Sequence, residues 1–173
     1  MPQIFSTSRA EAAVFRFPPL FFPIVFALAL ALQAYLPVLV HAAVYLDLPL
    51  LLIIYWAITT RSPASATVLG AVLGIAQDSL SHLALGVNGI AKTIIGYIDA
   101  SFGNRMDADH AGIRWLMVFG CYLLNRCVLF TFERFLLGTP IPWRGAVTTL
   151  AAAVNAVVAL LLYRGMDRFR SWM

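Results

Sequence analysis

The feature that most constrains this chain is a series of long apolar runs separated by short polar links. The sequence has 173 residues, of which 61% are hydrophobic and only 12% are charged. A soluble domain carries about 25% charged residues, which its surface needs. A lipid bilayer removes that need, and one helical crossing takes roughly 20 residues. The runs therefore predict an all-α, polytopic membrane protein, a compact bundle of about six transmembrane helices.

Prolines, glycines and polar links give the expected boundaries. We expect an N-terminal tail at 1–18, a six-helix transmembrane domain at 19–163 and a C-terminal tail at 164–173. The expected helices cover 19–40, 48–60, 65–81, 87–102, 113–137 and 143–163. The second is short, so we expect it to begin near Val44, with Asp47 at its mouth. The first apolar run is longer than the apolar core of a signal peptide, which has about 7–15 residues. We therefore interpret this run as a retained helix.

The basic residues predict the orientation of the bundle. Lys and Arg are retained on the cytoplasmic side of a membrane. If six helices alternate in direction, one side holds most of the flanking basic residues, namely Arg9, Arg16, Arg61, Arg105, Arg114, Arg164, Arg168 and Arg170. The other side holds Arg134 and Arg144. The sequence therefore predicts that both the N- and the C-terminus are cytoplasmic.

Polar side chains inside the apolar runs are the candidate site residues. A charge at the bilayer centre costs at least about 2.5–3.5 kcal/mol on insertion scales, so such residues normally face a partner or a cavity. The candidates are Asp78, Asn88, Lys92, Asp99, Arg126 and Glu133, and the amides of Gln77, Asn125 and Asn155 lie nearby. Asn88, Lys92 and Asp99 share one face of their helix, as do Arg126 and Glu133. Because the link between the third and fourth helices is short, we expect an ion pair between Asp78 and Lys92 in the outer leaflet.

Two interpretations of these residues remain open. Their charges nearly balance, which favours internal pairs that fix helix packing. Alternatively, they form a proton path, a substrate pocket or a partner-binding seam. His41, His82 and His110 lie at helix ends or in loops and make no metal-ligand pattern. We therefore expect no catalytic site, no metal and no cofactor.

The stretch 70–97, GAVLGIAQDSLSHLALGVNGIAKTIIGY, carries a recognisable pattern. Gly70, Gly74 and Asp78 follow one another at four-residue spacing, Leu85-Gly86 lies in the link, and Gly96-Tyr97 closes the next helix. The stretch resembles the rod shape-determining protein MreD family, which has such a glycine run ending in Asp, a Leu-Gly link and a Gly/Ala-Tyr pair. The candidate helix-packing residues are Gly70, Gly74, Gly86 and Gly96, since small residues let membrane helices approach closely.

The resemblance implies a non-enzymatic scaffold subunit of the bacterial cell-elongation (rod) complex, with several passes through the cytoplasmic (inner) membrane. It implies binding to an MreC-like bitopic protein, an MreB-like filament, and the glycosyltransferase and transpeptidase of lateral peptidoglycan synthesis. Nucleic acid is not an expected partner, because the basic residues stand singly between apolar runs.

Two other classes of function remain as alternatives. One is the substrate-capturing membrane subunit of an energy-coupling-factor-type vitamin importer, in which Asp78, Asn88 and Lys92 would line an outward pocket. The other is a membrane-embedded enzyme, which the missing catalytic constellation disfavours.

Overall fold

The computed structural model describes residues 20–81, 84–103, 110–135, 138 and 144–170. These residues form six α-helices and one short 3-10 helix, and no strand occurs among them. In chain order the elements are α1 (Phe21–Leu39), η1 (His41–Tyr45), α2 (Leu48–Thr60), α3 (Pro63–Ser81), α4 (Val87–Gly103), α5 (Ala111–Phe135) and α6 (Gly145–Arg170). The predicted all-α, six-helix architecture is confirmed for the described part of the chain.

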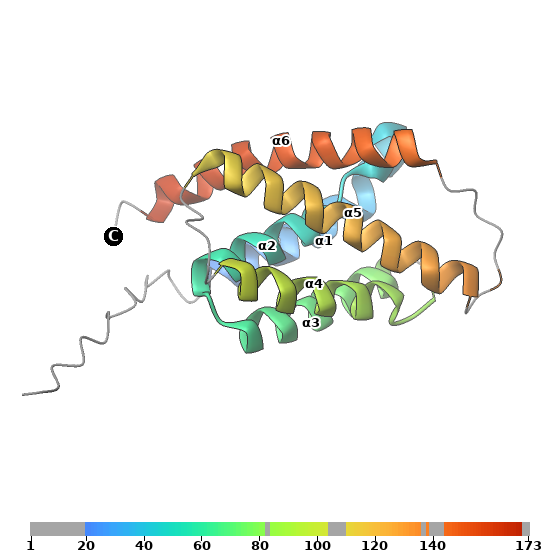
Figure 1. Cartoon of the computed structure of the whole chain (residues 1–173), viewed down its shortest axis with the longest axis horizontal. Coiled ribbons are helices and arrows are strands. Elements are labelled where there is room, and N and C mark those ends of the chain that lie inside the picture. Colours follow the sequence, from blue (N-terminus) through green and yellow to red (C-terminus); the bar gives the residue numbers. More distant parts are fainter. Residues whose placement is uncertain (1–19, 82–83, 104–109, 136–137, 139–143, 171–173) are drawn as a thin grey trace, which may run out of the picture.

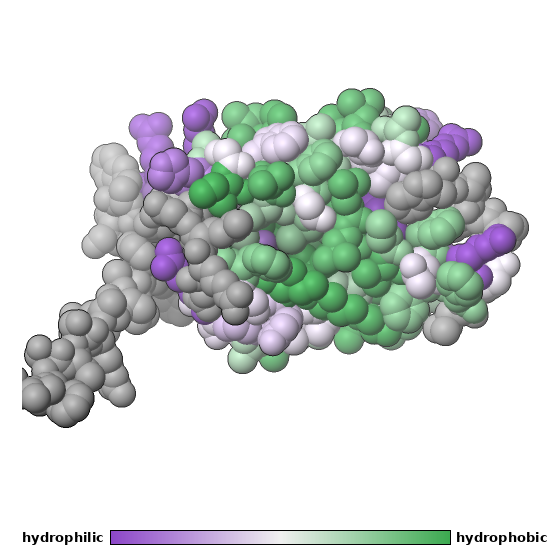
Figure 2. All heavy atoms as spheres, viewed as in Figure 1, coloured by the Kyte–Doolittle hydropathy of each residue, from purple (hydrophilic) through white to green (hydrophobic). Residues whose placement is uncertain are grey.

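Four described segments are long and apolar enough to cross a membrane: Phe21–Leu39, His41–Thr60, Ala111–Phe135 and Gly145–Arg168. The helices α3 and α4, which carry most of the candidate polar residues, are not among them. Figure 2 shows apolar side chains along the middle of the visible face and hydrophilic ones towards its two ends. This is the organisation of a multi-pass membrane protein.

The helices run back and forth along the long axis of the molecule (Figure 1). The end of α2, the start of α5 and the end of α6 therefore share one end of the bundle, where Arg61, Arg114 and Arg164 lie. Arg134 and Arg144 lie at the opposite end. The basic residues are thus divided between the two ends as the sequence indicated, and the cytoplasmic location of the termini stays a prediction.

Two helix boundaries differ by more than two residues from those expected. The second helix begins at Leu48 rather than near Val44, and η1 precedes it. Asp47 is the N-cap, because its side chain accepts a hydrogen bond from Leu50 N, and a proline in the first turn fits the helix start. The last helix continues to Arg170, beyond residue 163 where we expected the helix to end.

The second helix, α2, forms the centre of the bundle. Every described side chain from Leu48 to Ile58 except Trp56 is buried, and α2 contacts α1, α3, α4, α5 and α6. Trp56 packs edge-on against Phe22 of α1, with ring centroids 4.5 Å apart. A helix that is apolar all round can be buried on every side, and the contacts with five other helices bury α2.

The helices α3 and α4 form the most extensive pair in the bundle, and glycines line their contact. A Cβ atom added to Gly70 or Gly74 of α3 would lie within 3.0 Å of the backbone of Lys92 or Asn88 in α4. A Cβ atom added to Gly96 of α4 would lie equally close to the backbone of Ala66 in α3. The two backbones are therefore in direct contact at these three positions. Gly86, with φ of +100° and open space around it, turns the chain between the two helices.

Candidate functional site

Asp78, at the end of α3, caps the start of α4. Its carboxylate accepts hydrogen bonds from the backbone N–H groups of Gly86 (2.8 Å), Asn88 (3.1 Å) and Gly89 (3.3 Å), and from Asn88 Nδ2 (2.7 Å). The first N–H groups of a helix have no partner within it, and the positive end of the helix dipole favours an anion there. Asp78 is fully buried, and it satisfies backbone N–H groups that the first turn of α4 leaves without a partner inside the helix.

The predicted ion pair between Asp78 and Lys92 is wrong. Lys92 Nζ instead donates to Asp47 Oδ2 at 2.8 Å and to Asn88 Oδ1 at 3.2 Å. The reason is that backbone N–H groups at and before the start of α4 already donate to the Asp78 carboxylate. The Lys92 side chain instead extends towards the start of α2. Asn88 links the two carboxylates, because its amide donates to Asp78 and accepts from Lys92.

Asp47 is the centre of the buried polar contacts. Besides Lys92, it accepts from Leu50 N (3.1 Å) and from Asn125 Nδ2 (3.3 Å), and its own N–H donates to Asn155 Oδ1 (3.0 Å). One residue thus joins α2 to α4, α5 and α6. We call the buried residues Asp47, Asp78, Asn88, Lys92, Asn125 and Asn155 the polar network.

Amide side chains also hold the link before α2. Gln33 donates to Leu46 O (2.8 Å) and accepts from Leu48 N (2.9 Å). Asn155 Nδ2 donates to Tyr45 O (2.8 Å). In a bilayer, backbone groups outside a regular helix must find partners within the protein. These contacts therefore make a non-helical segment compatible with membrane depth.

A second polar cluster lies towards the other end of the bundle. Asp99 is buried in α4, and its Oδ1 accepts a weak hydrogen bond from Cys121 Sγ at 3.5 Å, while Oδ2 has no partner among the described residues. Arg114 of α5 forms an ion pair with Asp167 of α6, and Tyr55 of α2 donates to the same carboxylate at 3.1 Å. These contacts tie α5, α6 and α2 together at this end.

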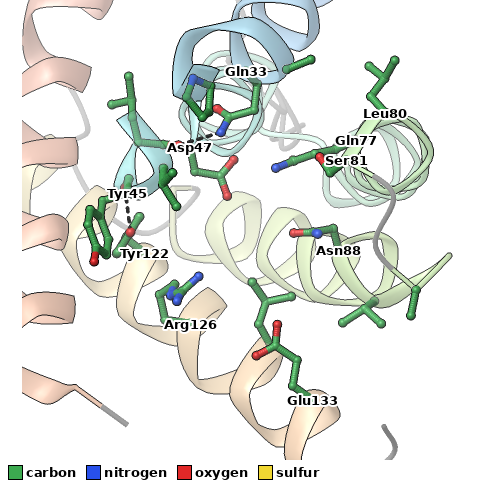
Figure 3. A pocket seen from close by; sticks show the side chains of 17 residues that line it. Gln33, Tyr45, Asp47, Gln77, Leu80, Ser81, Asn88, Tyr122, Arg126 and Glu133 are labelled. Atoms are coloured by element: carbon green, nitrogen blue, oxygen red, sulfur yellow. Dashed lines mark hydrogen bonds between the residues drawn. The ribbon is translucent and has the colours of Figure 1, made fainter. Parts of the chain in front are cut away.

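A cavity of about 500 Å³ borders the polar network. It lies at the end of the bundle where α1 and α3 end and α2 and α4 begin. Its wall combines side chains from α1, η1, α3, α4 and α5, and the polar ones include Gln33, Tyr45, Asp47, Gln77, Ser81, Asn88, Tyr122, Arg126 and Glu133. Figure 3 shows these side chains surrounding a common space, with Arg126 and Glu133 projecting from α5. Apolar residues such as Leu80, Val87 and Leu129 complete the wall.

The structure thus separates the candidate residues into three groups. Asp78, Asn88 and Lys92 lie together in the polar network. Asp99 lies apart from them in the second cluster, although it shares a helix face with Lys92. Arg126 and Glu133 lie on the cavity wall, and no ion pair joins them to each other or to the other candidates in the described part of the chain.

Sequence reasoning did not include Asp47 in the candidate set. Its burial depends on contacts with α4, α5 and α6, which are distant along the chain. The available signal was local: Asp47 precedes Pro49 at the start of an apolar run, a pattern typical of an N-cap. The pattern predicts the cap and says nothing about Lys92. Among the described residues, no group of three His, Cys, Asp or Glu side chains could hold a metal ion.

Comparison with known proteins gave one match. A family model described as rod shape-determining protein MreD matches residues 14–169 of the chain. Searches of curated proteins and of solved structures found no match.

Proposed function

The chain belongs to the rod shape-determining protein MreD family, and from this membership we propose that it is a non-enzymatic scaffold subunit of the bacterial cell-elongation complex. The single observation that carries the proposal is the family match, which extends over nearly all of the 173 residues. Membership supports a role in rod-shape determination at the level of the family. The specific partners and the cytoplasmic membrane as location are part of the proposal.

The proposed partners are an MreC-like bitopic protein, an MreB-like filament, and the glycosyltransferase and transpeptidase of lateral peptidoglycan synthesis. The described residues are nearly all helical, and the link between α2 and α3 is very short. Partners would therefore be recognised mainly within the membrane or at its surfaces. Large apolar side chains of α1 and α6, including Val38, Leu39, Val157 and Leu161, are exposed and available to partner helices or lipid.

We assign a structural role to the polar network. Its carboxylates and its lysine are buried and bonded to other parts of the same chain. Such satisfied contacts favour the interpretation in which internal pairs fix the helix packing. In this account the network holds α2, α4, α5 and α6 in position, and the partners bind elsewhere on the bundle.

Co-purification from membranes of the native host tests the proposed partnership. A tagged chain in mild detergent should retain an MreC-like bitopic protein. Asp78→Asn should lower the yield of the chain and of the partner in the same proportion, because the capping of α4 is weakened while the partner surface is not altered. The neighbouring variant Ser79→Ala, at an exposed position of α3, should leave both yields unchanged. A well-folded, abundant chain that retains no such protein would contradict the proposal.

The cavity favours a second candidate function, capture of a small molecule for an energy-coupling-factor-type importer. A pocket with apolar walls and a few convergent polar groups is the usual form of a ligand site, and the lining of this cavity contains groups of both kinds. The same co-purification distinguishes the two functions, because an importer subunit should retain a pair of ATPase subunits in place of the bitopic protein.

A further inference from the structure

The cavity wall contains a cation, Arg126, that forms no ion pair with another described residue. Arg126 lies within α5, a segment apolar enough to cross a membrane. Its side chain is exposed, lines the cavity, and has no hydrogen-bond or ion-pair partner among the described residues. Ionisable groups at membrane depth normally meet a partner or a water-filled cavity. Arg126 meets the cavity, which therefore presents a cation to any anion that enters it.

A buried amide on the facing wall also has an oxygen without a hydrogen-bond partner among the described residues. Gln77 of α3 is only 8% exposed, and its Oε1 has no hydrogen-bond partner in the described part of the chain. Figure 3 shows the Gln77 amide directed into the cavity, with Ser81 beside it. Buried polar groups are nearly always hydrogen-bonded, and an amide can present either its oxygen or its N–H groups after a rotation of the terminal torsion. Gln77 is therefore available to a ligand.

The acidic side chains of the wall leave Arg126 as the available charge. Asp47 is paired with Lys92 and also accepts from Leu50 and Asn125. Glu133 has an interaction of its own within the chain. Asp47 is thus engaged within the chain, whereas the Arg126 guanidinium has no hydrogen-bond or ion-pair partner among the described residues. A guanidinium binds phosphate or carboxylate through two parallel N–H donors.

Such an anion could come from a lipid headgroup or from free phosphate, and the place of the cavity favours the lipid. It opens at the end of a membrane bundle, beside apolar wall residues such as Leu80, Val87 and Leu129. Lipid headgroups are the oxyanions concentrated at the two faces of a bilayer, and an apolar wall suits the glycerol and first acyl carbons. We propose that the cavity binds the phosphate group of a membrane phospholipid, with Arg126 as the ion-pairing donor and with Gln77 and Ser81 as further hydrogen-bonding groups. This site goes beyond the scaffold function and does not depend on it.

Lipid binding to the purified full chain tests the proposal. The chain, in a neutral detergent, is titrated with a short-chain phosphatidylglycerol, and bound lipid is counted by native mass spectrometry. Arg126→Gln should weaken binding about tenfold or more, because a charge-assisted contact is lost. Arg126→Lys should give an intermediate affinity, since the charge stays but the two-pronged geometry does not. Arg134→Gln removes an exposed arginine of the same helix that is not on the cavity wall, and should bind like the wild type.

Gln77→Leu provides a second variant that does not alter any charge. It removes a buried group with an unpartnered atom, so folding should be maintained, while lipid binding should fall several-fold. Equal affinity of Arg126→Gln, Gln77→Leu and Arg134→Gln would overturn the proposal.

Two ligand controls identify the source of the bound group. A short-chain diacylglycerol, which lacks phosphate, should bind much more weakly than the phospholipid. Inorganic phosphate should compete only at far higher concentration. Equal binding of diacylglycerol, or equal competition by inorganic phosphate, would contradict a phospholipid site. Loss of the bitopic partner from Arg126→Gln with unchanged lipid binding would instead assign the cavity to a partner's carboxylate and would also overturn the proposal.

Discussion

Lys92→Met should lower the free energy of unfolding by about 3–5 kcal/mol, the usual effect of removing one partner from a buried ion pair. Lys92 is completely buried, and its Nζ lies 2.8 Å from Asp47 Oδ2. Without the ammonium group, the Asp47 carboxylate keeps its hydrogen bonds from Leu50 and Asn125 but loses its counter-charge at a largely buried position. Thermal or denaturant unfolding of the detergent-purified chain measures the effect. Arg134→Met, at an exposed position, is the matched control and should change stability by less than about 0.5 kcal/mol.

A double-mutant cycle separates the ion pair from the loss of side-chain packing. Asp47→Asn keeps an N-cap side chain for α2 and removes the negative charge. Combined with Lys92→Met, it removes both charges, which is far less unfavourable than leaving one buried alone. We therefore expect the double variant to be more stable than the sum of the single effects indicates. Strict additivity, or a Lys92→Met protein as stable as the wild type, would contradict the assigned role of the pair.

Gly74→Ala should destabilise the chain by about 2–3 kcal/mol, at the upper end of ordinary overpacking effects. The new methyl group would lie within 3.0 Å of the backbone of Asn88 and Gly89. No side-chain rotation relieves a contact with backbone, so α3 and α4 would have to separate. Because Asp78 lies one turn further along α3, separation would also weaken its bonds to the start of α4. The unfolding temperature and the yield of monodisperse protein both report this loss.

Gly120→Ala provides the control with the opposite expected sign. Gly120 is also within a long helix, but nothing lies within 4 Å of the position that its Cβ would take. Alanine is the better helix former by about 1 kcal/mol, so this variant should be as stable as the wild type or more so. If both alanine variants changed stability alike, the close α3–α4 contact would not be the cause.

The helices themselves could be predicted from the sequence, because their determinants are local. Apolar length gave six helices, and the predicted ends of the third and fourth lie within two residues of those observed. The glycine spacing on these two helices, which predicts close packing, is also a local signal that can be found in the sequence. The start of the second helix was misplaced because η1, an apolar 3-10 turn, extends the same run.

The site depends on contacts that no local pattern contains. Lys92 and Asp47 are 45 residues apart in the chain, and Asp47 and Asn155 are 108 apart. The short link correctly indicated that α3 and α4 are neighbours, but adjacency does not decide which group a carboxylate binds. The Asp78 carboxylate binds several backbone N–H groups and not the Lys92 ammonium group. The cavity likewise requires side chains from five elements, so its wall could not be assembled from spacing alone.

The most direct test of the account is cell shape in the native host after depletion of this chain. We predict that rod-shaped cells widen and become round as the protein disappears, and that re-expression of the wild type restores the ratio of length to width. Lys92→Met, expressed from the same promoter, should restore shape only in proportion to the amount of folded protein in the membrane. Cells that lose the protein completely and keep their rod shape and growth rate would contradict a role in shape determination.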